Sequence, residues 1–141
     1  MVANDRPYYE MLSDAPLFVN GPLTYYFKYF ATDLPFSPAI LPDLDYLKDA
    51  ETWVPLPMGP DWSGVLTHVA YRVRFMSNRA RADRYYNAFI CSPFQPPVGG
   101  FPAATDEAMQ EPDLQKRPGC KYCHSTIEPA AAYWGHWGEY R

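Results

Sequence analysis

The sequence lacks features that mark several common classes of protein. No apolar run reaches the roughly 18–20 residues needed to cross a bilayer, because Arg, Lys or Pro interrupts each long apolar stretch. Basic residues are not in excess: 12 Lys and Arg stand against 16 Asp and Glu, for a net charge of −4. The N-terminus has neither the positive region nor the apolar region of a signal peptide. We therefore expect no transmembrane segment and no nucleic-acid partner.

The remaining composition is that of a globular protein with much ordered loop. With 141 residues, 48% of them hydrophobic and 20% charged, the chain can form one compact domain with an apolar core. Aromatic residues make up 17%, and the 16 prolines are about twice the usual share. Long loops need an anchor in so short a chain, and a bound cofactor would supply one.

The N-terminal part, residues 1–62, is expected to hold short helices and a covering loop. Helices are predicted over Pro7–Leu12 and over Pro22–Phe30, with Asn20 as the cap of the second. The second helix is so rich in aromatic residues that we expect it to be buried. Closely spaced prolines rule out an ordinary helix in residues 31–62, apart from one turn near Leu44–Ala50. The apolar residues of this stretch favour a packed cover.

The C-terminal part, residues 63–141, is also expected to be helical. The clearest predicted helix is Gly64–Asn78, in which Val65, Val69, Val73 and Met76 form an apolar stripe. A second helix is predicted over Asp83–Cys91 and a weak one over Thr105–Gln115. Between them, residues 93–102 resemble a polyproline crossing. The predicted fold class is mainly α with extensive Pro-rich loops.

One motif carries specific chemistry. Cys120, Cys123 and His124 form Cys-x-x-Cys-His, the attachment sequence of haem c. Two cysteines three residues apart lie on one face of a helical turn, so both can form thioethers with the vinyl groups of one porphyrin. The adjacent histidine is then placed to ligate the iron. The motif predicts one covalently bound haem.

Two other readings of the cysteine pair compete with haem. A structural zinc site needs four ligands, and beyond the motif the sequence offers only Cys91, His68 and His136. A redox dithiol of the thioredoxin type expects a strand before the motif and an α/β pattern around it. The Pro-rich, mostly helical sequence matches neither pattern well.

The residues around the motif resemble a known family. The pentad is followed by Ile127-Glu128-Pro129, where family members usually read Met-Asp-Pro, and the chain closes with Gly-Glu-Tyr-Arg at 138–141. This arrangement resembles the C-terminal cytochrome region of planctomycete and myxobacterial multidomain c-type cytochromes. Residues 4–12, 64–68 and 91–97 resemble other segments of that family in the family's order. The resemblance implies an exported haem protein linked to electron transfer.

The sixth ligand of the iron stays open at the level of sequence. Only 17 residues follow His124 and none is Met, so the distal Met of ordinary small cytochromes c is absent from its usual place. The candidates are Met58, Met76, Met109, His68 and His136, or an open position. Met76 is preferred because it lies on the apolar stripe of the predicted helix, although a plain core methionine is the alternative.

Three further groups of residues have simpler interpretations. Cys91 is expected to be a buried small residue rather than a nucleophile. The aromatic tail is expected to pack on the porphyrin and the core; it comprises Tyr122, Tyr133, Trp134, Trp137 and Tyr140. Most of the basic run is expected to be a solvated helix face, with one member as a partner for a haem propionate; it comprises Arg72, Arg74, Arg79, Arg81 and Arg84.

Together these features predict one mono-haem cytochrome c-like domain spanning residues 1–141. Its predicted function is single-electron transfer with a redox partner or with other domains of a larger cytochrome, and no catalysis of its own. Thioether attachment takes place outside the cytoplasm, so the expected location is periplasmic or extracellular. The alternative is a five-coordinate haem c that binds small ligands or acts as a peroxidase, and a third possibility is a docking module stapled by its haem.

Overall fold

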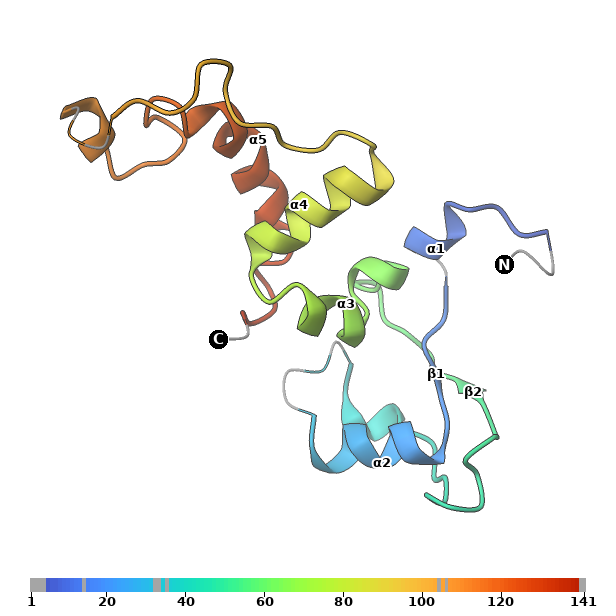
Figure 1. The fold of residues 1–141 in the computed structure, drawn as a ribbon. Helices are drawn as coiled ribbons and strands as arrows, with labels where there is room; N and C mark the ends of the chain where they lie inside the picture. The colour runs from blue at the N-terminus through green and yellow to red at the C-terminus, as the bar shows by residue number, and fades with distance from the viewer. Residues whose placement is uncertain are drawn as a thin grey trace. The chain divides into compact units, whose positions relative to one another are not determined.

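The computed structural model describes residues 5–13, 15–31, 34, 36–103, 105 and 107–139. Helix accounts for 41% of the chain and strand for 3%, which confirms the predicted mainly α class (Figure 1). The contacts divide the chain into two compact units, Met1–Arg74 and Phe75–Arg141. The sequence had suggested a division after residue 62, so the first unit takes in twelve residues that had been assigned to the haem-binding part.

The first unit is organised around a short strand pair that the sequence did not predict. The chain enters it through α1 (Glu10–Ser13), which is shorter than the predicted Pro7–Leu12 helix and is preceded by hydrogen-bonded turns. Strand β1 (Phe18–Val19) then pairs antiparallel with β2 (Val54–Pro55), with Phe18 opposite Pro55. Strands of two residues are too short to produce an alternating pattern, which explains why apolar periodicity did not reveal them.

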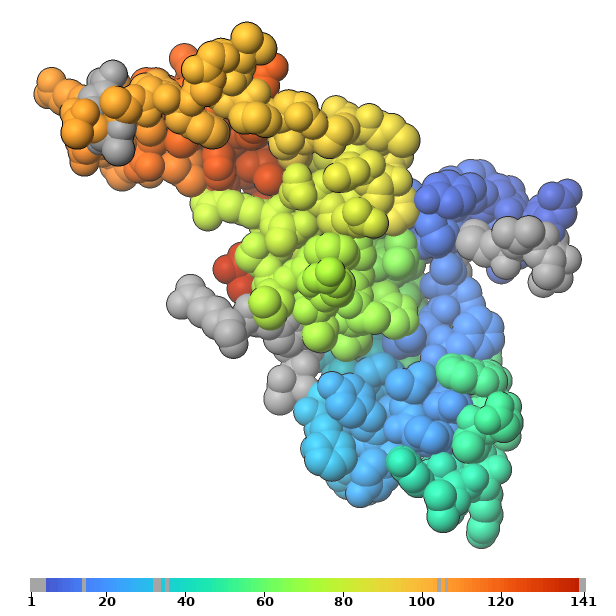
Figure 2. Space-filling view, viewed as in Figure 1, coloured from blue at the N-terminus to red at the C-terminus, as the bar shows by residue number. Residues whose placement is uncertain are grey.

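Helix α2 (Gly21–Tyr29) agrees with the predicted helix and its cap. The side-chain oxygen of Asn20 accepts a hydrogen bond from the backbone N–H of Leu23 at 3.0 Å, and proline occupies the first turn. The prediction that this helix is buried was wrong. Its buried residues are Gly21, Thr24 and Phe27, and the helix lies at the surface in the space-filling view (Figure 2).

The exposed aromatic residues of this region cover one another instead of entering the core. Tyr25 lies 4.7 Å from Tyr29 and 5.4 Å from Tyr46 between ring centroids, yet 45% of Tyr25 remains exposed. Phe30, which caps the helix, is 65% exposed. The small core of the unit accepts one aromatic ring from α2, and the remaining rings pack side by side at the surface.

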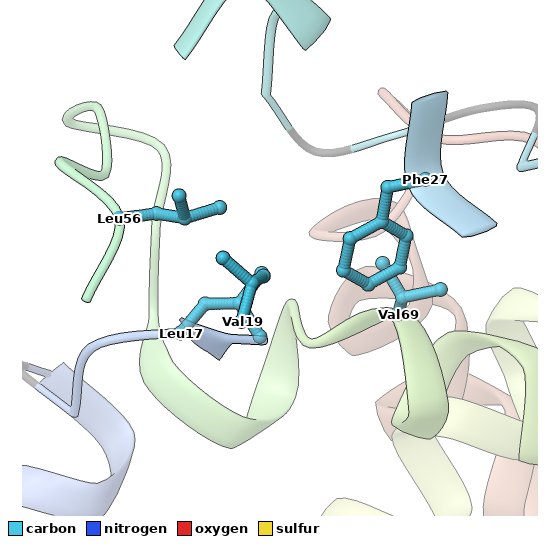
Figure 3. Packing of buried hydrophobic residues seen from close by; sticks show 5 residues of the cluster. All are labelled: Leu17, Val19, Phe27, Leu56 and Val69. Atoms are coloured by element: carbon cyan, nitrogen blue, oxygen red, sulfur yellow. The ribbon is translucent and has the colours of Figure 1, made fainter. Parts of the chain in front are cut away.

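The core of the first unit is a cluster of five buried residues (Figure 3). They come from β1 and its approach, from α2, from the residue after β2 and from α3 (Val69–Arg74): Leu17, Val19, Phe27, Leu56 and Val69. Apolar residues of the Pro-rich loop pack against this cluster, among them Phe36, Ile40, Met58 and Trp62. The Pro-rich stretch is therefore a packed cover, as predicted, and it covers the core of its own unit.

Hydrogen bonds to backbone carbonyls hold the covering loop to the N-terminal segment. Leu56 N–H donates to the carbonyl of Leu17 at 2.8 Å, and the indole N–H of Trp62 donates to the carbonyl of Ala15 at 2.8 Å. Within its described residues the loop forms β2, the 3₁₀ turn η2 (Pro38–Ile40) and a turn over residues 46–51, close to the predicted one. No ordinary helix forms in this described part of the loop, which agrees with the prediction.

The predicted helix Gly64–Asn78 was wrong as a continuous element. The chain forms a 3₁₀ turn, η3 (Gly64–Leu66), then α3 (Val69–Arg74), and begins a new helix at Asn78. Two local causes separate these pieces. The buried hydroxyl of Thr67 accepts the N–H of Ser63 at 2.9 Å, and the Ser77 hydroxyl caps the following helix through the N–H of Ala80 at 3.2 Å.

The apolar stripe assigned to that helix is consequently not one buried face. Val69 is buried, but Val73 is 48% exposed and Met76 is 54% exposed. The periodicity of four, four and three residues runs across the break, so it does not describe the face of a single helix.

The second unit is built on two packed helices. Helix α4 (Asn78–Phe89) contains most of the predicted Asp83–Cys91 helix but starts five residues earlier, and it packs against α5 (Lys121–Ala132). The weak helix predicted over Thr105–Gln115 is reduced to a 3₁₀ turn, η4 (Glu107–Gln110). The buried apolar residues of this unit come from both helices and from the segment after α5: Ala82, Ile127, Ala131, Trp134 and Trp137.

Candidate functional site

The Cys-x-x-Cys-His residues lie at the beginning of α5. Cys120 has helical backbone angles at the cap position, and its carbonyl accepts the N–H groups of Cys123 at 3.1 Å and His124 at 3.0 Å. The two cysteines are therefore one helical turn apart, as the spacing predicts. Both are partly exposed and neither is in a disulfide. Two thiols on one accessible turn can react with two groups on one edge of a planar ligand.

The imidazole of His124 is held by a carboxylate on the same helix. Its Nδ1 lies 2.7 Å from Oε1 of Glu128, one turn further along α5. The same oxygen accepts a hydrogen bond from Nε of Arg79, also at 2.7 Å, so α4 contributes to the arrangement. The His124 and Glu128 side chains are about four-fifths buried, at 23% and 21% exposure. The result is a chain of three polar groups across the α4–α5 contact.

The charge of Glu128 is stabilised by its two partners. Burial of the carboxyl raises its pKa, but hydrogen bonds and charge interactions with Arg79 and His124 outweigh burial, and the net pKa is lowered. Glu128 is therefore an ionised acceptor near neutral pH. Sequence reasoning treated this residue only as part of a family motif, although its spacing of four from His124 was a usable signal. Nothing local in the sequence links Arg79 to it.

The Pro-rich crossing lies against the start of α5. The Cys123 thiol donates to the carbonyl of Gln95 at 3.5 Å. Gly119, just before the motif, has a φ of +78°, and a Cβ there would come within 3.0 Å of the Phe101 ring and 3.1 Å of Pro102. A glycine is therefore required both by the backbone angle and by the close approach of the crossing. The loop limits one side of the motif.

The aromatic tail behaves as predicted only in part. Trp134 and Trp137 are buried at 2% and 9% exposure, which agrees with packing in a core. Tyr122 is 66% exposed and Tyr133 is 47% exposed, so these two do not pack in the protein core. Tyr140 lies outside the described residues. The helical periodicity of α5 and the following turn leaves the two tyrosines exposed and the two tryptophans buried.

The candidate sixth ligands are spread over both units. Met58 packs at the edge of the first unit's core. His68, also in the first unit, accepts the N–H of Ala70 on Nδ1 at 3.0 Å, and burial lowers its pKa. In the second unit, Met76 is exposed in the loop before α4 and Met109 is half-buried in η4.

His136 is the remaining candidate. It is exposed and lies edge-on to Trp137, with ring centroids 5.6 Å apart. Its ring is therefore supported by the tail of the second unit rather than by α5 itself.

The expectation for Cys91 was wrong, and the expectation for the basic run holds for most of its members but not for all. Cys91 is exposed, not buried, because it follows the end of α4 with a φ of +55° and turns away from the helix. Most of the basic run is exposed, as expected, since Arg74, Arg79 and Arg84 lie at the surface, but Arg72 and Arg81 are fully buried. Arg81 is retained in the interior because backbone carbonyls accept its hydrogen bonds, among them Phe75 at 2.8 Å and Gly138 at 3.1 Å.

Outside the motif, the described residues include a surface hollow but no cluster of metal-ligating side chains. No three side chains of His, Cys, Asp or Glu converge there in the manner of a metal site. No helix in the same residues has the length and hydropathy to span a membrane. A surface hollow of about 720 Å³ lies in the first unit, lined by Tyr25, Tyr26, Phe30, Tyr46 and neighbouring residues. Aromatic side chains form most of its lining.

Comparison of the chain with protein-family models, with curated proteins and with solved structures found no match. The residues of α5 and their partners on α4 therefore carry the functional argument alone.

Proposed function

We propose that this chain is a c-type cytochrome that carries one covalent haem and transfers single electrons to and from a redox partner. The observation that supports it is the start of α5, where two free thiols share one helical turn beside a histidine whose ring is fixed by Glu128. A zinc site would require further ligands to converge with this pair. A haem requires from the protein only two thiols and one axial imidazole at this position.

The residues present fit a haem, and each has a distinct role. Cys120 and Cys123 would form the thioethers, each thiol adding across a vinyl group and transferring its hydrogen to the new side chain. His124 would supply the proximal nitrogen. Bound in this way, the iron supplies a one-electron ferric–ferrous couple, and the protein sets its potential through ligands, hydrogen bonds and burial. Thioether attachment is an extracytoplasmic process, so we also propose a periplasmic or extracellular location.

The proposal is tested by absorption spectra of the full chain produced with an export signal and the cytochrome c assembly machinery. Haem bands that survive denaturation and acid–organic extraction are expected, because thioethers are covalent. The Cys120→Ala, Cys123→Ala variant should carry no haem that resists extraction, whereas Cys91→Ala should retain such haem. Wild-type protein without haem bands would refute the proposal and favour zinc or thiol chemistry.

For the sixth ligand we propose Met76, which belongs to the same unit as His124. Iron with a His/Met ligand pair is low-spin, and carbon monoxide does not readily displace the methionine. The near-infrared band that reports Met ligation should disappear in Met76→Ala and persist in Met109→Ala, the matched control in the same unit. A band that persists in Met76→Ala would refute this assignment.

The alternative proposal is a five-coordinate haem c that binds small ligands or reacts with peroxide. The 54% exposure of Met76 favours it, because a side chain facing solvent has not been preorganised as a ligand. A high-spin spectrum that shifts on adding carbon monoxide would support this alternative against the electron carrier.

A further inference from the structure

The chain of Arg79, Glu128 and His124 is more specific than a surface ion pair. His124 and Glu128 lie four residues apart on α5, and Arg79 reaches the same carboxylate oxygen from α4. Both distances are 2.7 Å, and the carboxylate side chain is 21% exposed. Two helices therefore fix the position of one carboxylate oxygen in front of one imidazole nitrogen.

This contact distinguishes the two nitrogens of the His124 ring. Nδ1 faces the carboxylate, so in the neutral ring the proton resides on Nδ1 and the lone pair on Nε2. Within the described part of the chain, Nε2 has no hydrogen-bond partner. A ring arranged in this way presents Nε2 as the donor to a metal, and a carboxylate on the other nitrogen is a common support for metal-binding imidazoles.

Arg79 donates a second hydrogen bond to the Glu128 carboxylate, in competition with the imidazole. Its guanidinium shares Oε1 with the imidazole, so it draws electron density away from the Glu128–His124 hydrogen bond. It also offsets the negative charge of the partly buried carboxylate. The arginine thus holds Glu128 in place while moderating its effect on the histidine.

We propose that Glu128 is a positioning residue for the proximal ligand, which directs Nε2 of His124 to the haem iron and lowers the reduction potential, and that Arg79 limits this effect. A carboxylate that accepts a hydrogen bond from Nδ1–H makes the imidazole a stronger electron donor to the metal. A stronger electron donor stabilises ferric iron more than ferrous iron. The inference rests on the proposed haem function. It adds a residue and a direction of control that haem attachment alone does not require.

The test is the midpoint potential of the matured holoprotein, measured by mediated spectroelectrochemical titration. Glu128→Gln keeps an oxygen acceptor of the same size but removes the charge, so the potential should rise. A tenfold loss of ferric preference would raise the potential by about 59 mV for one electron. Glu139→Gln is the matched control, because Glu139 in the same unit accepts the N–H of Asn78 at 2.8 Å.

Arg79 provides a second variant with the opposite expected sign. In Arg79→Gln the carboxylate interacts with the imidazole without competition, so the potential should fall. Arg84→Gln is its control: Arg84 is also exposed on α4, and it lies 5.9 Å from the centre of the Phe75 ring instead of near Glu128. This pair keeps the proposal testable if Glu128→Gln does not mature.

The outcomes separate the inference from the proposed function. Haem-loaded wild type with equal potentials for Glu128→Gln and Glu139→Gln, or for Arg79→Gln and Arg84→Gln, overturns the inference and leaves the cytochrome standing. Variants that lose only thermal stability, with an unchanged potential, also overturn it, because they reduce the three residues to a structural link. Wild type that takes up no haem overturns both.

Discussion

Replacing the buried Arg81 should destabilise the second unit more than any other change of one arginine on α4. Arg81 is fully buried and joins the start of α4 to the C-terminal segment. Its Nε donates to the carbonyl of Phe75 at 2.8 Å, and its Nη2 donates to the carbonyls of Gly138 at 3.1 Å and Met76 at 3.4 Å. In Arg81→Met these carbonyl acceptors lose their buried donor while the aliphatic volume is roughly retained.

The expected cost follows from the two shorter carbonyl contacts. A hydrogen bond to a charged group contributes about 1.5–3 kcal/mol, so losing both costs ~3–6 kcal/mol of unfolding free energy. A unit spanning Phe75–Arg141 has a total stability of ~3–10 kcal/mol at the usual value per residue. Arg81→Met should therefore leave this unit near its unfolding midpoint, and Arg81→Lys, which keeps the charge but not the forked geometry, should lie in between.

The assay is urea unfolding of the holoprotein, followed by circular dichroism and by tryptophan fluorescence. Trp134 and Trp137 are buried in the same unit, so their emission reports its unfolding. Arg84→Met is the matched control, because Arg84 is exposed and its contact with the Phe75 ring contributes at most about 1 kcal/mol. If Arg81→Met unfolds at the same urea concentration as Arg84→Met, the reasoning about the hydrogen bonds of the buried arginine is refuted.

Three further predictions concern pH, cofactor and backbone. Burial holds the pKa of His68 below its ordinary value of 6.5, so the contribution of His68 to stability is present above pH 6.5 and is lost as pH falls through the folded pKa. The thermal unfolding temperature between pH 7 and 5 should therefore depend less on pH in His68→Asn than in wild type. An equal pH dependence would contradict this. Cys120→Ala, Cys123→Ala protein without haem should be largely unfolded, and a cooperative melting transition would show that the fold does not need its cofactor. Gly64→Ala should destabilise the first unit by more than about 1 kcal/mol in urea unfolding, because φ is +51° and the added Cβ would collide with the carbonyl of Met11; an unchanged midpoint would refute this requirement.

The fold was predictable where a local signal decided it. Asn20 and the proline after it marked the start of α2, and the clustered prolines correctly excluded a helix from the covering loop. The predicted helix Gly64–Asn78 failed because two side chains, Thr67 and Ser77, form hydrogen bonds that end one element and begin another. Such competition depends on the surrounding packing and is weakly visible in apolar periodicity.

Burial was the least predictable property. The aromatic character of α2 suggested an interior helix, but the core of its unit has room for Phe27 alone among its rings. The arginine run suggested a solvated face, yet Arg81 is buried because the carbonyls of Phe75 and of the distant Gly138 both accept hydrogen bonds from its guanidinium. A long charged side chain is buried only when such acceptors converge, and convergence is a property of the folded chain.

The sequence by itself determined the helical class, the cap of α2, the proline-rich cover and the spacing that sets Cys120 and Cys123 on one turn. These features depend on residues within a few positions of one another, where backbone sterics and helical geometry act directly. Only the tertiary structure brought Arg79 to the carboxylate of Glu128, since that contact joins α4 to α5 between residues 49 positions apart. The pairing requires α4 to pack against α5, and the free energy of that packing comes from apolar surface distributed over both helices.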